Sequence, residues 1–212
     1  MDSPLTRLRT GLPSDSCVDD STLSRALYSS DSSLYRVVPQ AVARPRNVDE
    51  LVSVARAALN AGLPITGRGA GTSCAGNAVG AGLVVETRAH LNRILAIDPD
   101  EGTATVEPGV VQDTLQRAAR PYGLRFGPDP STSSRCTIGG MIGNNACGPR
   151  ALGYGRTADN IVALQVLTGR GELIELGGPG ADPLPNLRKI VEAGLGTIRT
   201  EFGRFPRQIS GY

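Results

Sequence analysis

Two glycine-rich segments, far apart in the chain, constrain what this sequence can fold into more than any other feature. Residues 67–77 read GRGAGTSCAGN, and residues 136–148 read CTIGGMIGNNACG. Because glycine has no Cβ, it tolerates positive φ and lets the backbone come close to a ligand. Successive N–H groups in such a loop form a concavity that binds anions. Two such loops, each following a strand-rich segment, predict a longer ligand held at both ends, such as a dinucleotide.

The composition limits the classes of protein to which the chain can belong. Its 212 residues fit one generous domain or two small lobes. A hydrophobic content of 40% and a charged content of 20% are ordinary for a soluble globular protein. The chain has no Trp, three Phe and five Tyr, and its net charge is only +2. Few stacking side chains and little positive charge argue against a nucleic-acid partner.

Membrane segments and metal sites are not expected either. No apolar run is long enough to span a bilayer, and the first residues lack the basic and apolar regions of a secretory signal. Four cysteines without a Cys-x-x-Cys pair, and one histidine (His90), argue against a metal site built from this chain alone. We therefore expect free thiols and a cytoplasmic protein, with peripheral association at the inner membrane as the alternative.

Hydrophobic periodicity and turn residues predict alternating helices and short strands. We expect helices over residues 20–27, 47–61, 110–122 and 184–202, and strands over residues 41–45, 63–66, 83–86, 93–98, 103–106, 161–168 and 172–176. Residues 1–19 are rich in Ser, Asp and Pro and are expected to be irregular. Residues 126–160 are dense in Gly, Pro, Asn and Ser, and an ordered loop of this length is usually functional.

These elements divide the chain into three parts. An N-terminal segment (1–34) precedes a first lobe (35–125) and a second lobe (126–212). In the last expected helix, apolar residues at helical spacing predict a buried stripe, made of Leu187, Ile190, Val191, Leu195, Ile198 and Phe202.

The first glycine-rich segment partly matches the Rossmann pattern of NAD sites. Gly67-x-Gly69 follows an expected strand, and the acidic Glu86 lies at the end of the next strand. A Rossmann site, however, needs a helix whose N-terminus faces the pyrophosphate, and no helix of useful length fits between Gly71 and Leu83. We therefore favour a phosphate cradle made of loop N–H groups and hydroxyls over both a Rossmann site and a plain surface loop.

The second segment combines close backbone approach with polar side chains. Asn144 and Asn145 offer both donors and acceptors, which suits a heterocycle with carbonyls and ring nitrogens. Thr137 adds a hydroxyl. The alternative is that the Asn-Asn pair forms a simple turn.

At this point the residues resemble a known family. Segment 35–176 is similar to the FAD-binding domain of the vanillyl-alcohol oxidase, or p-cresol methylhydroxylase, type. The matching motifs are residues 67–73 (GRGAGTS), 107–109 (EPG), 127–131 (GPDPS) and 136–148. Within that family the similarity is greatest to the glycolate oxidase, D-lactate dehydrogenase and D-2-hydroxyglutarate dehydrogenase branch, which includes large bacterial enzymes with an iron–sulfur domain. The resemblance implies an α+β fold of two lobes, with small mixed sheets flanked by helices and FAD between them.

The resemblance also implies which residues bind the cofactor. The first segment would cradle the pyrophosphate, the second would line the ribityl chain and isoalloxazine, and residues 161–162 would contribute backbone contacts. The implied residues are Arg68, Gly69, Ala70, Gly71, Thr72, Ser73, Gly76, Asn77, Pro130, Thr137, Gly139, Gly140, Gly143, Asn144, Asn145, Gly148, Ile161 and Val162. Some relatives link the flavin to a histidine where this chain has Thr72, so FAD would be non-covalent. For Cys136, a packed free thiol is favoured over a thioether to flavin.

The resemblance implies an oxidoreductase. Similar enzymes oxidise the carbon bearing a hydroxyl and pass a hydride to flavin N5, here from a D-2-hydroxy acid such as D-lactate, glycolate or D-2-hydroxyglutarate. The base belongs to a following substrate domain in relatives, and we expect this chain to lack that domain. The catalytic residues are therefore unassigned, and the partners would be a substrate domain and, in some relatives, an iron–sulfur domain.

Other interpretations remain open at the level of sequence. Arg150 and Arg156 are expected either to contact phosphate or substrate carboxylate or to be solvated loop arginines, and His90 is expected at the surface. The chain could instead be a non-catalytic dinucleotide-binding module that needs a partner chain. A flavin reductase of the cell-wall precursor type would have similar lobes, but we would not expect it to contain the Asn-Asn-Ala-Cys-Gly stretch that this chain has at residues 144–148.

Overall fold

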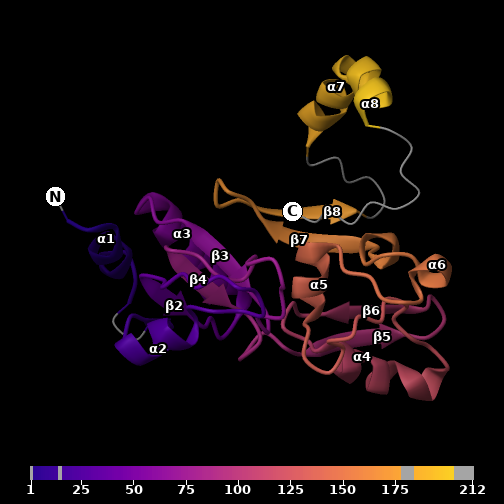
Figure 1. Cartoon of the computed structure of the whole chain (residues 1–212), viewed down its shortest axis with the longest axis horizontal. Helices are drawn as coiled ribbons and strands as arrows, with labels where there is room; N and C mark the ends of the chain where they lie inside the picture. Colours follow the sequence, from indigo (N-terminus) through magenta and orange to yellow (C-terminus); the bar gives the residue numbers. More distant parts are fainter. Residues whose placement is uncertain (1, 14–15, 178–183, 203–212) are drawn as a thin grey trace.

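A computed structural model describes residues 2–13, 16–177 and 184–202 (Figure 1). The first half is built on a four-stranded sheet in the order β1-β2-β4-β3. Strands β2 (Ala41–Ala43), β4 (Leu83–Glu86) and β3 (Ile65–Arg68) are parallel, and β1 (Val18–Asp19) is antiparallel to β2. All four residues of β4 are buried, as expected for a central parallel strand covered on both faces.

Helix α3 (Val48–Asn60) packs on this sheet and has the ends that the sequence predicts. The Asn47 side chain accepts a hydrogen bond from the Glu50 N–H at 2.8 Å, and acidic residues occupy the first turn. Val54 and Ala58 are fully buried, so the apolar face of the helix covers the sheet. Helix α2 (Thr22–Leu27) precedes β2.

The expectation that residues 1–19 are irregular is wrong. Residues 4–10 form helix α1 (Pro4–Thr10), capped by Ser3, whose hydroxyl accepts from the Thr6 N–H at 3.1 Å. Proline at the first helical position lacks only an N–H that the helix would leave unpaired. Leu8 is fully buried in the same core cluster as Val54 and Leu83, so this segment contributes to the core of the first half.

The second half contains two separate β-hairpins (Figure 1). Strands β5 (Ile94–Asp98) and β6 (Thr103–Val106) form the first hairpin, as the sequence predicts, and α4 (Gln112–Ala119) follows it. A short 3₁₀ helix, η1 (Arg120–Tyr122), extends α4 to the predicted boundary. A second core cluster combines Val110 and Leu115 with Cys136, Ile138 and Met141.

The region 126–160 is not the long loop that its composition suggests. It contains helix α5 (Ile138–Asn144), helix α6 (Ala151–Tyr154) and the 3₁₀ helix η2 (Ala158–Asn160). Helix α5 forms despite its glycines because its apolar residues are buried: Ile138 is 4% exposed and Met141 is 2% exposed. Tertiary burial therefore overrides the low helix propensity of glycine.

Strands β7 (Ala163–Leu167) and β8 (Leu173–Gly177) form the second hairpin, as predicted. The Arg56 Nε donates a hydrogen bond at 2.7 Å to the Gly171 carbonyl, which joins the turn of this hairpin to α3. The two hairpins and the four-stranded sheet thus form an α+β fold.

The last predicted helix is divided at Gly194 into α7 (Pro185–Ala193) and α8 (Leu195–Glu201), which stand apart from the sheets in Figure 1. Its stripe is not buried as expected: Ile190 is 67% exposed and Phe202 is 64% exposed. Leu187, Val191 and Ile198 are exposed as well. The helical spacing correctly indicates a shared face, but in the described part of the chain that face packs against little else.

Candidate dinucleotide-binding site

Strand β3 ends at Arg68 and leads directly into the first glycine-rich segment, which is a loop as predicted. Gly71 and Gly76 have positive φ angles of 69° and 80°. Among the described residues, the backbone N–H groups of residues 70–73 have no hydrogen-bond partner. Four consecutive unpaired N–H groups in a partly buried loop need an acceptor, and an anion supplies one.

Two polar side chains of this loop fix its shape. The Ser73 Oγ accepts hydrogen bonds from the N–H groups of Ala75 (3.2 Å) and Asn77 (3.3 Å), and it is 2.9 Å from the Asn77 Oδ1. Ser73 and Asn77 therefore organise the loop, and the resemblance alone did not indicate this role.

The two glycine-rich segments meet in space. A Cβ at Gly69 would clash with the Oγ1 of Thr137, which caps α5 by accepting from the Gly140 N–H at 3.2 Å. The two N–H groups between Thr137 and Gly140 are paired with the backbone: Ile138 donates to the Val110 carbonyl and Gly139 to the Pro108 carbonyl, each at 2.8 Å. The first four N–H groups of α5 are therefore paired within the protein, whereas those of residues 70–73 are not.

Both segments line one cavity of about 630 Å³, which is within the usual size range of ligand sites. The predicted residues that line it are Arg68, Gly69, Ala70, Gly71, Thr72, Ser73, Asn77, Pro130, Thr137, Gly139, Gly140, Gly143 and Asn144. Lining residues that were not predicted as site residues include Thr66, Ala78, Thr87, Pro108, Thr132 and Met141. Some of these lie on strands or in the core, where composition gives no signal of a ligand.

Helix α5 presents glycine to this cavity. Gly139, Gly140 and Gly143 line it without side chains, and the Asn144 Nδ2 donates back to the Gly140 carbonyl at 3.1 Å. A helix surface without side chains lets a flat ring approach the backbone closely. This end of the cavity suits a planar heterocycle, whereas the end with unpaired N–H groups suits an anion.

Five predicted residues do not line the cavity: Gly76, Asn145, Gly148, Ile161 and Val162. Gly76 packs on the Tyr35 ring, Gly148 packs against Asp129, and Val162 is 70% exposed. Asn145 ends α5 in the left-handed conformation with a φ of 46°, a conformation that asparagine tolerates.

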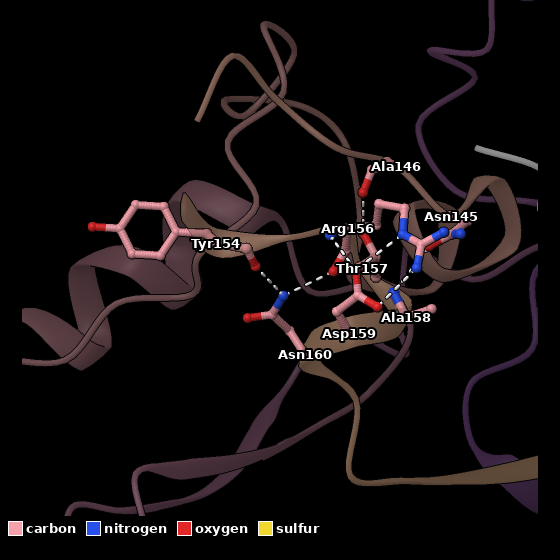
Figure 2. Close-up of polar contacts among 8 residues, drawn as sticks. All are labelled: Asn145, Ala146, Tyr154, Arg156, Thr157, Ala158, Asp159 and Asn160. Carbon is pink, nitrogen blue, oxygen red and sulfur yellow. Dashed lines mark hydrogen bonds and ion pairs between the residues drawn. The ribbon is translucent and has the colours of Figure 1, made fainter. Parts of the chain in front are cut away.

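Figure 2 shows that Asn145 belongs to a polar network on the segment that follows α5. Its Oδ1 accepts from the Ala158 N–H at 3.0 Å. Thr157, which is fully buried, donates both its N–H (2.9 Å) and its hydroxyl (2.7 Å) to the Ala146 carbonyl. These bonds tie residues 145–146 to η2 and thereby support the end of the helix that lines the cavity.

The arginines considered as anion ligands are used elsewhere. The Arg156 Nε and Nη2 each donate to the Asp159 carboxylate at 2.9 Å, and this pairing lowers the pKa of Asp159 to about 2 (Figure 2). The Arg150 Nε is 3.4 Å from the Asp129 Oδ2. Neither arginine lines the cavity.

Arg68 is the cation of the cavity. Its Nη1 donates to the carbonyls of Ser30 (2.9 Å) and Ala78 (3.0 Å), and its Cζ lies 5.1 Å from the centroid of the Tyr28 ring. It forms no ion pair within the described chain, and burial lowers its pKa. Arg68 therefore makes the lining beside the unpaired N–H groups positive.

The Rossmann interpretation does not fit this geometry. Residues 69–82 contain no helix, and β3 and β4 are adjacent parallel strands. Glu86 is 6% exposed, accepts from the Ala89 N–H at 3.2 Å and does not line the cavity. Its carboxylate is therefore part of a turn in the interior.

The cysteines fit a non-covalent site. Cys136 is 5% exposed at the cavity wall, and burial raises the pKa of its thiol, so the thiol is packed and protonated. None of the four cysteines, all of which the structure describes, is in a disulfide, and His90 is exposed. Within the described ranges, no three His, Cys, Asp or Glu side chains are grouped so as to hold a metal ion.

The fold and the cavity define the chain as an α+β domain with a two-part candidate site for a dinucleotide. Solved structures of alkyldihydroxyacetonephosphate synthase have this fold: one superposes with a TM-score of 0.70 over 84% of this chain and 34% of the synthase, at 21% identity. The profile of the FAD binding domain family matches residues 39–177. The chain belongs to the FAD binding domain family.

Two relatives illustrate the branch of the family. D-2-hydroxyglutarate dehydrogenase of Escherichia coli (strain K12) is 37% identical over 183 residues, covering 85% of this chain and 17% of the enzyme. Glycolate oxidase subunit GlcD of Bacillus subtilis (strain 168) is 41% identical over 162 residues, covering 76% of this chain and 34% of the subunit. The matched part of the chain thus spans only 17% and 34% of the length of these two relatives.

Proposed function

We propose that this chain is the FAD-binding part of a flavin-dependent oxidoreductase that oxidises a D-2-hydroxy acid such as D-lactate, glycolate or D-2-hydroxyglutarate. The observation that supports it is the single cavity with two chemically different ends. One end has unpaired N–H groups and the Arg68 cation, and the other has the glycine face of α5. FAD has the matching parts, a pyrophosphate and a flat isoalloxazine.

The residues present fit non-covalent FAD. We assign the pyrophosphate to the N–H groups of residues 70–73, with the Thr72 hydroxyl beside them. The isoalloxazine would lie along Gly140, Gly143 and Asn144, where no large side chain fills the space. For Ile161 and Val162 we retain the proposed backbone contact, although they lie outside the cavity. When bound, the flavin accepts a hydride at N5 from the carbon that bears the hydroxyl.

In this proposal, the described residues that line the cavity bind and orient the cofactor but do not supply a base for the substrate hydroxyl. The described lining of the cavity includes no Asp, Glu or His side chain. A proton acceptor for the hydroxyl of a 2-hydroxy acid must therefore come from other residues. This supports the proposal that turnover needs a substrate domain, with an iron–sulfur domain as a further partner in relatives of that type. The same observation favours the second candidate, a cofactor-binding module or subunit that is inactive without a partner chain.

The domain boundaries and the location are also proposals. We retain the division at residues 34 and 125, with the qualification that α1 and β1 belong to the core of the first half. Four cysteines without a disulfide among them support a reducing compartment such as the cytoplasm, with peripheral membrane association as the alternative. No helix in the described part of the chain could cross a membrane.

The direct test is the visible absorption spectrum of the purified chain after incubation with FAD and desalting. We expect retained flavin bands that disappear on denaturation, because the cofactor is not covalently attached. The matched variants are Gly67→Leu, which adds a side chain at the cavity lining, and Gly169→Leu, on the β7–β8 turn. A Cβ at either position meets no protein atom within 4 Å, so both variants should fold.

Gly67→Leu should lose the flavin and Gly169→Leu should keep it. A folded wild-type chain that stays colourless, or that retains NAD in place of FAD, would contradict the assignment of the cavity. Flavin retention together with oxidation of D-lactate by the chain alone would contradict the proposed need for a further domain.

A further inference from the structure

The segment at residues 28–35 lies before the region 39–177 that matches the family, yet it contacts the first glycine-rich loop at three places. The Ser32 N–H and Oγ lie 3.1 Å and 3.3 Å from the Gly71 carbonyl. The Asp31 Oδ2 accepts from the Ala78 N–H at 3.3 Å. A Cβ at Gly76 would lie 2.7 Å from the Tyr35 ring. The contacts are distributed along the loop from Gly71 to Ala78, which directly follows it.

Arg68 closes the same loop from its other side. Its Nη1 joins the carbonyl of Ala78, at the end of the loop, to the carbonyl of Ser30 in the N-terminal segment. The guanidinium also lies beneath Gly71, where a Cβ would be 2.5 Å from its Nη2, and beside the Tyr28 ring. A lysine could keep the charge, but it could not bridge both carbonyls and stack on the ring with one planar group.

The N-terminal segment is itself held in a fixed turn. The Asp31 Oδ1 accepts from the Ser33 N–H at 2.8 Å, and the Val37 N–H donates to the Ser29 carbonyl at 2.8 Å. The groups that reach the glycine loop therefore start from an ordered support. A loop with four glycines loses much conformational entropy when it is ordered. That entropic cost weakens ligand binding unless the loop is already ordered in the free protein.

We propose that residues 28–35 and Arg68 form a brace that holds the first glycine-rich loop in its binding shape before the ligand arrives. In this role Arg68 is a positioning residue, and the N-terminal segment is part of the cofactor site although it lies outside the matched family region. This inference rests on the proposed function for its effect on FAD affinity. Its effect on the order of the loop does not depend on any ligand.

The test uses the full chain with Arg68→Lys and Asp31→Ala, and with Arg56→Lys as the matched control. The Arg56 guanidinium also donates to a backbone carbonyl, that of Gly171, but outside the loop. Hydrogen exchange is followed at the amides of Ala75 and Asn77 without FAD. Both are bonded to the Ser73 Oγ inside the loop, so they report its order. FAD affinity is then measured by titration.

We expect faster exchange at both amides in Arg68→Lys and Asp31→Ala, with unchanged exchange in the strands. The FAD dissociation constant should rise about tenfold in Arg68→Lys, which corresponds to about 1.4 kcal/mol. At saturation the flavin spectrum should match that of the wild type, because the bound loop has the same shape. Arg56→Lys should change neither exchange nor affinity.

Unchanged exchange in both brace variants would overturn the proposal, whatever their affinity. Lower affinity with normal exchange would mean that Arg68 acts on the ligand directly. A wild-type chain that does not bind FAD would refute the proposed function, and the exchange rates would still decide whether the brace exists. If Arg68→Lys fails to fold, Asp31→Ala provides the same comparison.

Discussion

Glycine is required in this site for two different reasons, and each reason applies to different residues. Gly71 and Gly76 have positive φ, which other residues adopt only at a cost. Gly69 and Gly139 do not, but a Cβ on either would meet a neighbour: the Thr137 hydroxyl or Pro108. Gly69 thus allows the two segments to touch, and Gly139 allows the start of α5 to pack on Pro108. Spacing in a sequence does not reveal such contacts.

Substitution of Gly139 tests this second reason. Its Cβ would lie 2.7 Å from the Pro108 Cβ and 2.9 Å from the Pro108 carbonyl oxygen. We expect Gly139→Ala to lower the free energy of unfolding by about 1–3 kcal/mol, as overpacking does, even though alanine favours a helix. Gly153→Ala on α6 meets nothing within 4 Å and should be neutral or stabilising. Urea unfolding measures the stability of both variants. If Gly139→Ala and Gly153→Ala changed the free energy of unfolding equally, close packing would not explain why position 139 needs glycine.

Glu86 predicts a dependence of stability on pH. Burial raises the pKa of its carboxyl above the ordinary value, so the folded state disfavours the charged form. The resulting penalty develops as pH rises through the unfolded pKa, and it is complete once pH exceeds the folded pKa. We expect Glu86→Gln to raise the melting temperature at pH 7, and the difference to vanish below about pH 4. The exposed Glu101→Gln is the control, and a destabilised Glu86→Gln at pH 7 would contradict the argument.

At the scale of elements, the sequence predicts the strands and helix α3 better than it predicts the glycine-rich helix α5. The ranges of β4, α3, β5 and β6 follow from apolar periodicity, caps and turns, which are local signals. Helix α5 was missed because three glycines hide a helical spacing of Ile138, Met141 and Ile142. The same mistake explains why residues 136–148 were expected to be a loop. The first segment, which contains no large apolar residue, is a loop as predicted.

The end of α5 gives a prediction about its cap. Asn145 combines a left-handed backbone with a side-chain hydrogen bond to the Ala158 N–H. Asn145→Gly removes the side chain but keeps the permitted backbone, whereas Asn145→Ala loses both. We expect Asn145→Ala to cost about 2 kcal/mol, and Asn145→Gly about 1 kcal/mol less, in urea unfolding. If the two variants were equally stable, the left-handed conformation would carry no cost here.

The whole molecule divides into a body with the cavity and a helical pair, α7 and α8, that packs on little of it. Leu187, Ile190, Val191, Ile198 and Phe202 are all exposed, so this pair adds apolar surface and little core. Every residue that lines the cavity lies between Ile65 and Ala146, well before this pair. The family match also ends at residue 177. Cofactor binding and the helical pair are therefore expected to be separable.

Deletion of residues 178–212 tests this separation. We expect the shortened chain to retain FAD with an affinity within about twofold of the full chain, a difference of less than about 0.5 kcal/mol. Binding of a dye that reports exposed apolar surface should fall, because the exposed face of the helical pair is removed. The matched comparison is a chain that keeps residues 178–212 but carries Ile190→Ser and Phe202→Ser, which should lower dye binding without altering affinity. Loss of flavin on deletion, with affinity kept in the double variant, would instead mean that the helical pair supports the cavity through its backbone or its remaining side chains.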